Sequence, residues 1–112
     1  MNWSEFVDFW NRTKDIYDEK RDDGEKHREV ACRAAQLGKG MERGVRYLGY
    51  AKEYVDKAYK KSTPHLREKW GGAEAIDADS EKDLKNNEIG FSLGRGNPRG
   101  DCRELSKRQK SR

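Results

Sequence analysis

The apolar residues of this chain recur at intervals of three and four, in stretches separated by glycine, proline or acidic turns. The first stretch places six residues on one helical face: Trp3, Phe6, Val7, Trp10, Thr13 and Tyr17. The same spacing returns around Val30 and Ala34, along residues 45–58, and from Leu84 to Phe91. Such spacing is typical of amphipathic helices, whereas strands alternate apolar and polar residues. It predicts an all-α fold.

The breaks in the pattern divide the chain into a small bundle of about four helices. The expected helices cover residues 3–20, 25–37, 41–61 and 80–94. Ser80 is the expected N-cap of the last helix, because Asp83 follows three residues later. Residues 64–79 are expected to form mainly a loop. Gly44 and Gly49 are expected to mark places where another helix packs closely.

The length of 112 residues fits one domain, and an apolar fraction of 32% against a charged fraction of 41% predicts a thin core. We expect a helical bundle over residues 1–94. A basic, irregular tail over residues 95–112 would pack back on it, with a short helix around residues 103–110.

Positive charge is concentrated in this tail. From Ser92 onward there are seven basic and two acidic residues, a net charge of +5, which leaves −1 on residues 1–91. The basic residues are Arg95, Arg99, Arg103, Lys107, Arg108, Lys110 and Arg112. They could bind an anionic polymer or lipid surface, or they could only solubilise a frayed end.

Cys32 and Cys102 allow one disulfide between the tail and the body, or two ordinary thiols. The N-terminus lacks a basic segment followed by an apolar one, and no apolar run approaches the length of a membrane span. We therefore expect no transmembrane segment. The protein would be cytoplasmic, or exported without a cleaved signal peptide.

Several polar residues fall on otherwise apolar helical faces. His27 heads the small-residue face of the second helix, Asn87 lies between Leu84 and Phe91, and Glu53 precedes Asp56 by one turn. Buried polar groups need partners. The set could be a structural network, or an acid–base site in which His27, Glu53, Asp56, Asp83 and Asn87 take part. The histidines and cysteines match no metal-binding spacing, so we predict neither a metal nor a cofactor.

The aromatic residues of the first helix are candidates for apolar contact. Trp3, Phe6 and Trp10 could pack in the core, or they could seat a lipid or another apolar ligand. The opposite face of this helix is mainly acidic, which is unusual for a helix that lies on a membrane.

Four motifs carry a family resemblance: His27…Cys32, Gly49-Tyr-Ala-Lys-Glu-Tyr-Val-Asp56, Asp83-Leu-Lys-Asn-Asn-Glu-Ile-Gly90, and Asp101-Cys102. With them the chain resembles a helical domain at the C-terminal ends of bacterial Rhs and related polymorphic-toxin proteins. More distantly, it is similar to serum amyloid A. The resemblance implies a four-helix fold in which Asp83, Asn86 and Asn87 lie at a helix end and clamp the tail. Serum amyloid A is a non-enzymatic, self-associating lipid-binding protein.

These observations predict a small non-enzymatic binding module whose basic tail and aromatic face contact a lipid or membrane surface, or nucleic acid. One alternative is a bacterial toxin or effector enzyme with a catalytic polar cluster around His27. Another is a phage or mobile-element accessory protein that binds a host protein. A homo-oligomer is compatible with each.

Overall fold

The computed structural model describes residues 3–109, which form six helices and no strand. The helices are α1 (Trp3–Asp18), α2 (Asp23–Gln36), α3 (Lys39–Ser62), α4 (Pro64–Trp70), α5 (Ala73–Gly96) and α6 (Cys102–Arg108). The all-α prediction is confirmed. The predicted number of about four helices is too low, because α4 formed where a loop was expected, and the short helix expected around residues 103–110 of the tail is a distinct helix, α6.

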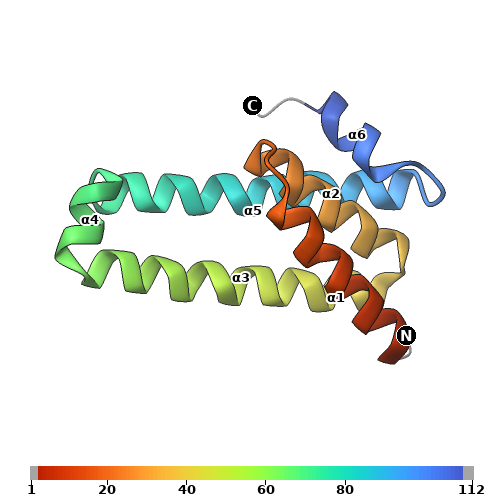
Figure 1. Cartoon of the computed structure of the whole chain (residues 1–112), viewed down its shortest axis with the longest axis horizontal. Coiled ribbons are helices and arrows are strands. Elements are labelled where there is room, and N and C mark those ends of the chain that lie inside the picture. Colours follow the sequence, from red (N-terminus) through yellow and green to blue (C-terminus); the bar gives the residue numbers. More distant parts are fainter. Residues whose placement is uncertain (1–2, 110–112) are drawn as a thin grey trace.

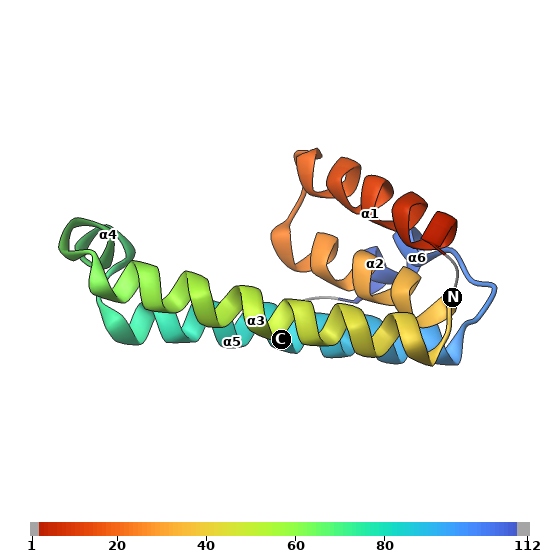
Figure 2. The same ribbon diagram turned by 90° about the horizontal axis from the view of Figure 1, so that it is seen from below.

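The two longest helices, α3 and α5, run side by side as a hairpin that α4 closes at its far end (Figure 1). Gly71 and Gly72 turn the chain between α4 and α5 with φ angles of 92° and 99°, a region that favours glycine. At the other end α2 packs along α5, and α1 crosses over α2 (Figure 2). The far half of the hairpin therefore extends beyond the body of the protein.

The core lies where α1, α2, α3 and α5 meet. Its buried residues are Phe9, Ile16, Val30, Ala31, Ala34, Ala35, Met41 and Phe91. The expected apolar face of α1 was wrong in part, because Trp3 is 77% and Trp10 46% exposed. The residues of α1 buried in the core are Phe9 and Ile16, which widen that face. Small side chains on α2 do allow a close approach, and the partner is α5. A Cβ added at Gly44 would meet no other atom within 4 Å, so close packing there was a wrong prediction.

The start of α5 also differs from the prediction. The helix begins at Ala73 and Ser80 is buried within it, so Ser80 is not an N-cap. Ile76 is 2% exposed, so the first turns of α5 are already packed against neighbouring helices. The helix also continues past Gly94 to Gly96.

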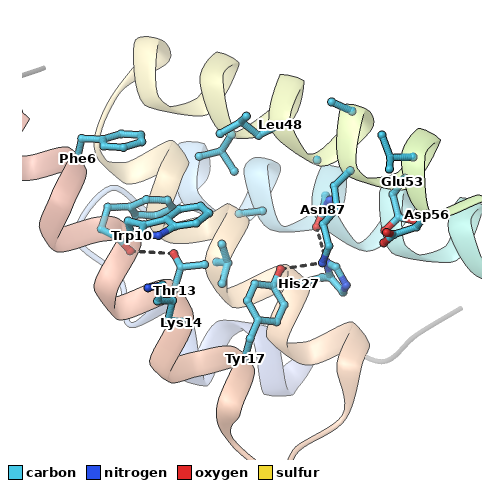
Figure 3. A pocket seen from close by; sticks show the side chains of 18 of the residues that line it. Phe6, Trp10, Thr13, Lys14, Tyr17, His27, Leu48, Glu53, Asp56 and Asn87 are labelled. Carbon is cyan, nitrogen blue, oxygen red and sulfur yellow. Dashed lines mark hydrogen bonds between the residues drawn. The ribbon is translucent and has the colours of Figure 1, made fainter. Parts of the chain in front are cut away.

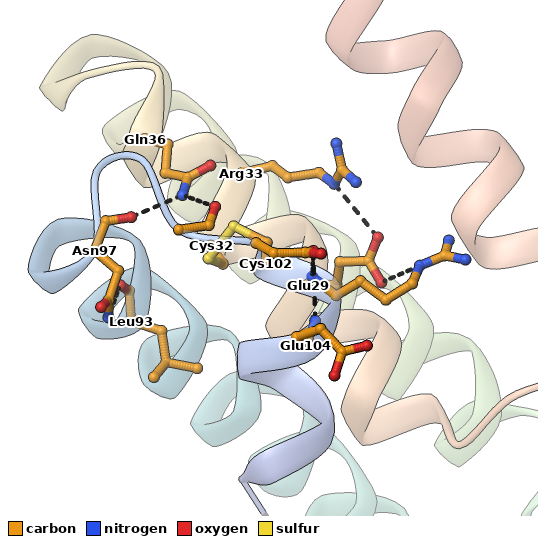
Figure 4. Close-up of a disulfide and its surroundings, with 11 residues drawn as sticks. Glu29, Cys32, Arg33, Gln36, Leu93, Asn97, Cys102 and Glu104 are labelled. Atoms are coloured by element: carbon orange, nitrogen blue, oxygen red, sulfur yellow. Dashed lines mark hydrogen bonds and ion pairs between the residues drawn. A yellow bond between two sulfur atoms is a disulfide. The ribbon is translucent and has the colours of Figure 1, made fainter.

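The C-terminal segment packs back on α2, as expected, and the short helix expected within it is α6. Asp101 caps α6 by accepting from the backbone amides of Arg103 and Glu104. A disulfide joins Cys32 to Cys102, and the Gln36 amide nearby donates to two backbone carbonyls of the preceding loop (Figure 4). Lys110 and Arg112 lie outside the described residues. None of the helices described is both long and apolar enough to cross a membrane.

Candidate functional site

A groove of about 800 Å³ lies between α1, α2 and α3. Aromatic and aliphatic side chains form most of its wall: Phe6, Phe9, Trp10, Val30, Val45, Leu48 and Val55. Polar residues gather at one end, where Tyr17, His27 and Asn87 meet (Figure 3). The groove thus has a long apolar part and a hydrogen-bonding end.

His27 is the centre of the polar end. Its Nδ1 lies 3.0 Å from Oδ1 of Asn87 on α5 and 3.2 Å from the hydroxyl of Tyr17 on α1. Its Nε2 lies 3.5 Å from Oδ1 of Asp83. Because the Asn87 oxygen can only accept, Nδ1 donates to it, and in the neutral imidazole the lone pair of Nε2 faces Asp83.

A second part of the network links α3 to α5. The hydroxyl of Ser80 donates to Oε2 of Glu53 at 2.8 Å, and Glu53 also shares a hydrogen bond with Asp83. Glu53 is 8% exposed and Ser80 2%. The polar groups of α1, α2, α3 and α5 are therefore connected from Tyr17 through His27 and Asp83 to Glu53.

Burial and crowding of carboxylates shift the pKa values in this network. Burial and the charge of Glu53 raise the pKa of Asp83 to about 7. Burial lowers the pKa of His27, against the opposing effect of its hydrogen bond to Asn87. Burial, with the charges of Asp83 and Glu53, raises the pKa of the Tyr17 hydroxyl. Near neutral pH these shifts in pKa favour a neutral His27 imidazole beside an Asp83 carboxyl that is partly protonated.

The candidate residues named from sequence come together in part. His27, Glu53, Asp83 and Asn87 form the network, and Asp56 lines the groove one turn along α3 from Lys52. Asp83, Asn86 and Asn87 lie in the middle of α5, so the helix-end position implied by the resemblance is wrong. Of these three, Asn86 is connected to the tail, through the guanidinium of Arg28 that also binds the Ser106 carbonyl of α6.

The apolar candidates join the same site. Phe6 and Trp10 line the groove, whereas Trp3 stacks on Phe6 from outside, with ring centroids 5.6 Å apart. Sequence reasoning missed Tyr17 and Ser80 as members of the polar network. Tyr17 ends the helical face that also carries Phe6 and Trp10, and this position was the available signal.

The basic candidates of the tail have mixed surroundings. Arg95 donates to Glu42 at 2.7 Å, and Arg103 donates to Glu19 at 2.5 Å. Lys107 lies 3.8 Å from Glu104. Arg99 and Arg108 are exposed.

Within residues 3–109 no group of three or more histidine, cysteine or acidic side chains is placed to hold a metal ion. The chain matches no protein-family model, no curated protein and no solved structure. The resemblance to the Rhs-associated domain and to serum amyloid A therefore stays a prediction.

Proposed function

We propose that this chain is a non-enzymatic binding module that holds a single-chain amphipathic lipid in the groove. The supporting observation is the groove itself, which combines about 800 Å³ of space with an apolar wall and one polar end. Pockets of this size and lining bind small amphipathic molecules. The hydrocarbon chain would lie against Trp10, Val45 and Leu48, with the headgroup near Tyr17 and Lys52.

The exposure of the wall supports the same proposal. Leu48 is 47% and Val55 63% exposed, so much apolar surface faces the groove rather than the core. Covering such surface is favourable by about 25 cal/mol per Å². An aliphatic chain would cover it without any change in the helices.

The test is a titration with lysophosphatidylcholine below its micelle concentration, followed by the fluorescence of Trp10. Trp3→Phe and Trp70→Phe leave Trp10 as the one tryptophan. Leu48→Asp should abolish the response, because it places a charge in the apolar wall. Leu37→Asp is the matched control, since Leu37 is also 47% exposed but does not line this groove. No saturable response, or equal loss in both variants, would contradict the proposal.

A second function is supported by one observation, the 3.5 Å approach of His27 Nε2 to Asp83 Oδ1 at the polar end. In this alternative the chain is a bacterial toxin or effector enzyme with His27 as its acid–base group. Expression should then harm bacteria, and His27→Ala should relieve the harm while thermal unfolding shows that the variant is folded. A harmless parent chain would exclude this function.

A further inference from the structure

A second surface, distinct from the groove, lies on α3. Arg43, Tyr47, Tyr50, Tyr54, Lys57 and Lys61 follow one another at intervals of four and three residues, which places them on one face of the helix. We name this set the tyrosine stripe. We propose that the tyrosine stripe binds single-stranded nucleic acid, with bases stacked on its phenol rings and phosphates beside its cations.

The rings of the stripe are unusually open to solvent. Tyr47 and Tyr54 are each 74% exposed, and Tyr50 is 49% exposed. Successive rings are separated by about 4.5 and 6 Å along the helix axis, from the rise of 1.5 Å per residue. Exposed aromatic rings in series beside basic residues are the features by which proteins bind single strands without reading their sequence.

The charge of this part of the molecule fits an anionic polymer. Residues 39–70, which contain α3 and α4, carry nine basic and four acidic residues, a net charge of +5. Two of the acidic residues, Glu42 and Glu53, are buried. Lys57 and Lys61 share one carboxylate, that of Asp77, at 3.8 and 2.6 Å, so this contact leaves a net positive charge.

The composition of the stripe favours a single strand over the other possible occupants. A helix that lies on a membrane inserts Trp, Phe or Leu side chains, but the rings of the stripe are all tyrosines, and Leu48 and Val55 face the groove. A second copy that packed stripe against stripe would bring Arg43 and Lys61 against cations of its own. Bases and phosphates together match both components of the stripe.

The experiment uses the full chain and a fluorescently labelled oligothymidylate of about 12 nucleotides, which spans a typical site. Binding is followed by anisotropy at low salt. Tyr47→Ala and Tyr54→Ala should each weaken binding by roughly tenfold, because each removes one stacking platform. Tyr47→Phe keeps the ring and should keep the affinity.

Tyr59→Ala is the matched control. Tyr59 is also exposed, at 63%, but it follows Tyr50 by nine residues and so points to the opposite side of α3. This variant should bind like the wild type. Arg43→Gln should reduce the slope of log affinity against log salt by about 0.7, the contribution of one phosphate contact on a single strand.

Three results would overturn the inference. They are no binding at low salt, equal weakening by Tyr59→Ala, and binding to phosphatidylserine vesicles without binding to the oligonucleotide. The lipid titration of the groove is independent of these results, because Tyr47 and Tyr54 do not line it.

Discussion

Gly90 of α5 lies directly against the main chain of Arg28 in α2. A Cβ on Gly90 would stand 2.3 Å from the Arg28 carbonyl oxygen and 2.7 Å from the Cβ of Ala31. Gly94 has the same relation to Cys32, with a distance of 2.3 Å to its carbonyl oxygen. The two helices approach so closely because α5 has no side chain at either position, and this contact sets the place of α2 beside the groove.

Gly90→Ala should therefore destabilise the fold by about 1–3 kcal/mol or more, because the backbone carbonyl that it meets cannot rotate away. Urea unfolding measures the change. Gly44→Ala is the matched control, since a Cβ there meets nothing within 4 Å. It should raise stability by roughly 0.5–1 kcal/mol, because alanine is the better residue within a helix. Equal effects at both positions would show that α2 and α5 do not meet at Gly90.

Reduction of the Cys32–Cys102 disulfide should lower the free energy of unfolding by about 2–4 kcal/mol. The bond connects residues 70 apart in sequence, so it restricts the unfolded chain strongly. Urea unfolding with and without dithiothreitol measures the loss. The double variant Cys32→Ala, Cys102→Ala should already have the lower stability and should not respond to dithiothreitol. Thiol titration of the unreduced, denatured wild type should find neither cysteine reactive, and two reactive thiols would contradict the prediction.

The pKa of Asp83, about 7 in the folded chain against 3.8 for a free side chain, makes stability depend on pH. The folded chain keeps a proton that the unfolded chain releases, so the contribution of Asp83 to stability falls as pH rises between these values. The amide of the Asp83→Asn variant does not titrate, so this variant does not lose stability in this way. The stability of the variant minus that of the wild type should therefore be lowest near pH 4 and should increase to a plateau above about pH 7. Urea unfolding of both proteins across this range tests the prediction.

Asp77→Asn provides the control of opposite sign. The hydrogen bond from Lys61 lowers the pKa of Asp77, so its ionised form stabilises the fold. This variant should be less stable than the wild type above about pH 4 and should match it at lower pH. If the stability of both variants relative to the wild type changed with pH in the same direction, the raised pKa of Asp83 would be contradicted.

The contrast between Ser80 and His27 shows how far the sequence could predict the structure. Helical periodicity identified α1, α2 and α3 because each has a continuous apolar face. Ser80 followed by Asp83 has the local pattern of an N-cap. The burial of Ile76, however, favours a helix that begins before Ser80, at Ala73. Tertiary packing decided where α5 begins, and the pattern of a single sequence does not contain this information.

The candidate site could be predicted residue by residue but not as one place. His27 and Asn87 were recognised because polar residues on apolar faces need partners. Their contact across 60 residues depends on the Gly90 approach of α5 to α2. Trp10 lines the same groove because of the way α1 crosses α2. The approach of α5 to α2 has a partial signal, because Gly90 and Gly94 are four residues apart and face the small residues of α2, but the crossing of α1 over α2 has none.

Arg28 carries the last prediction, because it connects three helices from a position that is 3% exposed. Its guanidinium on α2 donates to Oδ1 of Asn86 on α5 at 2.8 Å and to the carbonyl of Ser106 on α6 at 3.1 and 3.2 Å. Arg28→Met keeps most of the volume but leaves two buried acceptors without this donor. The cost should be about 2–6 kcal/mol, because each buried acceptor left without a partner costs about 1–3 kcal/mol.

The loss should be local to α6. In Arg28→Met the amides of residues 102–108 should exchange hydrogen faster, while the disulfide keeps the helix attached to α2. Arg28→Lys should give a similar result, because an ammonium group cannot reach both acceptors with the planar geometry of the guanidinium. Arg33→Met is the control on the same helix: its side chain is 29% exposed, and its partner Glu29 keeps Arg21 at 2.7 Å, so its loss should cost less than that of Arg28. If α6 exchanged at the same rate in Arg28→Met and in Arg33→Met, the disulfide alone would hold the C-terminal helix.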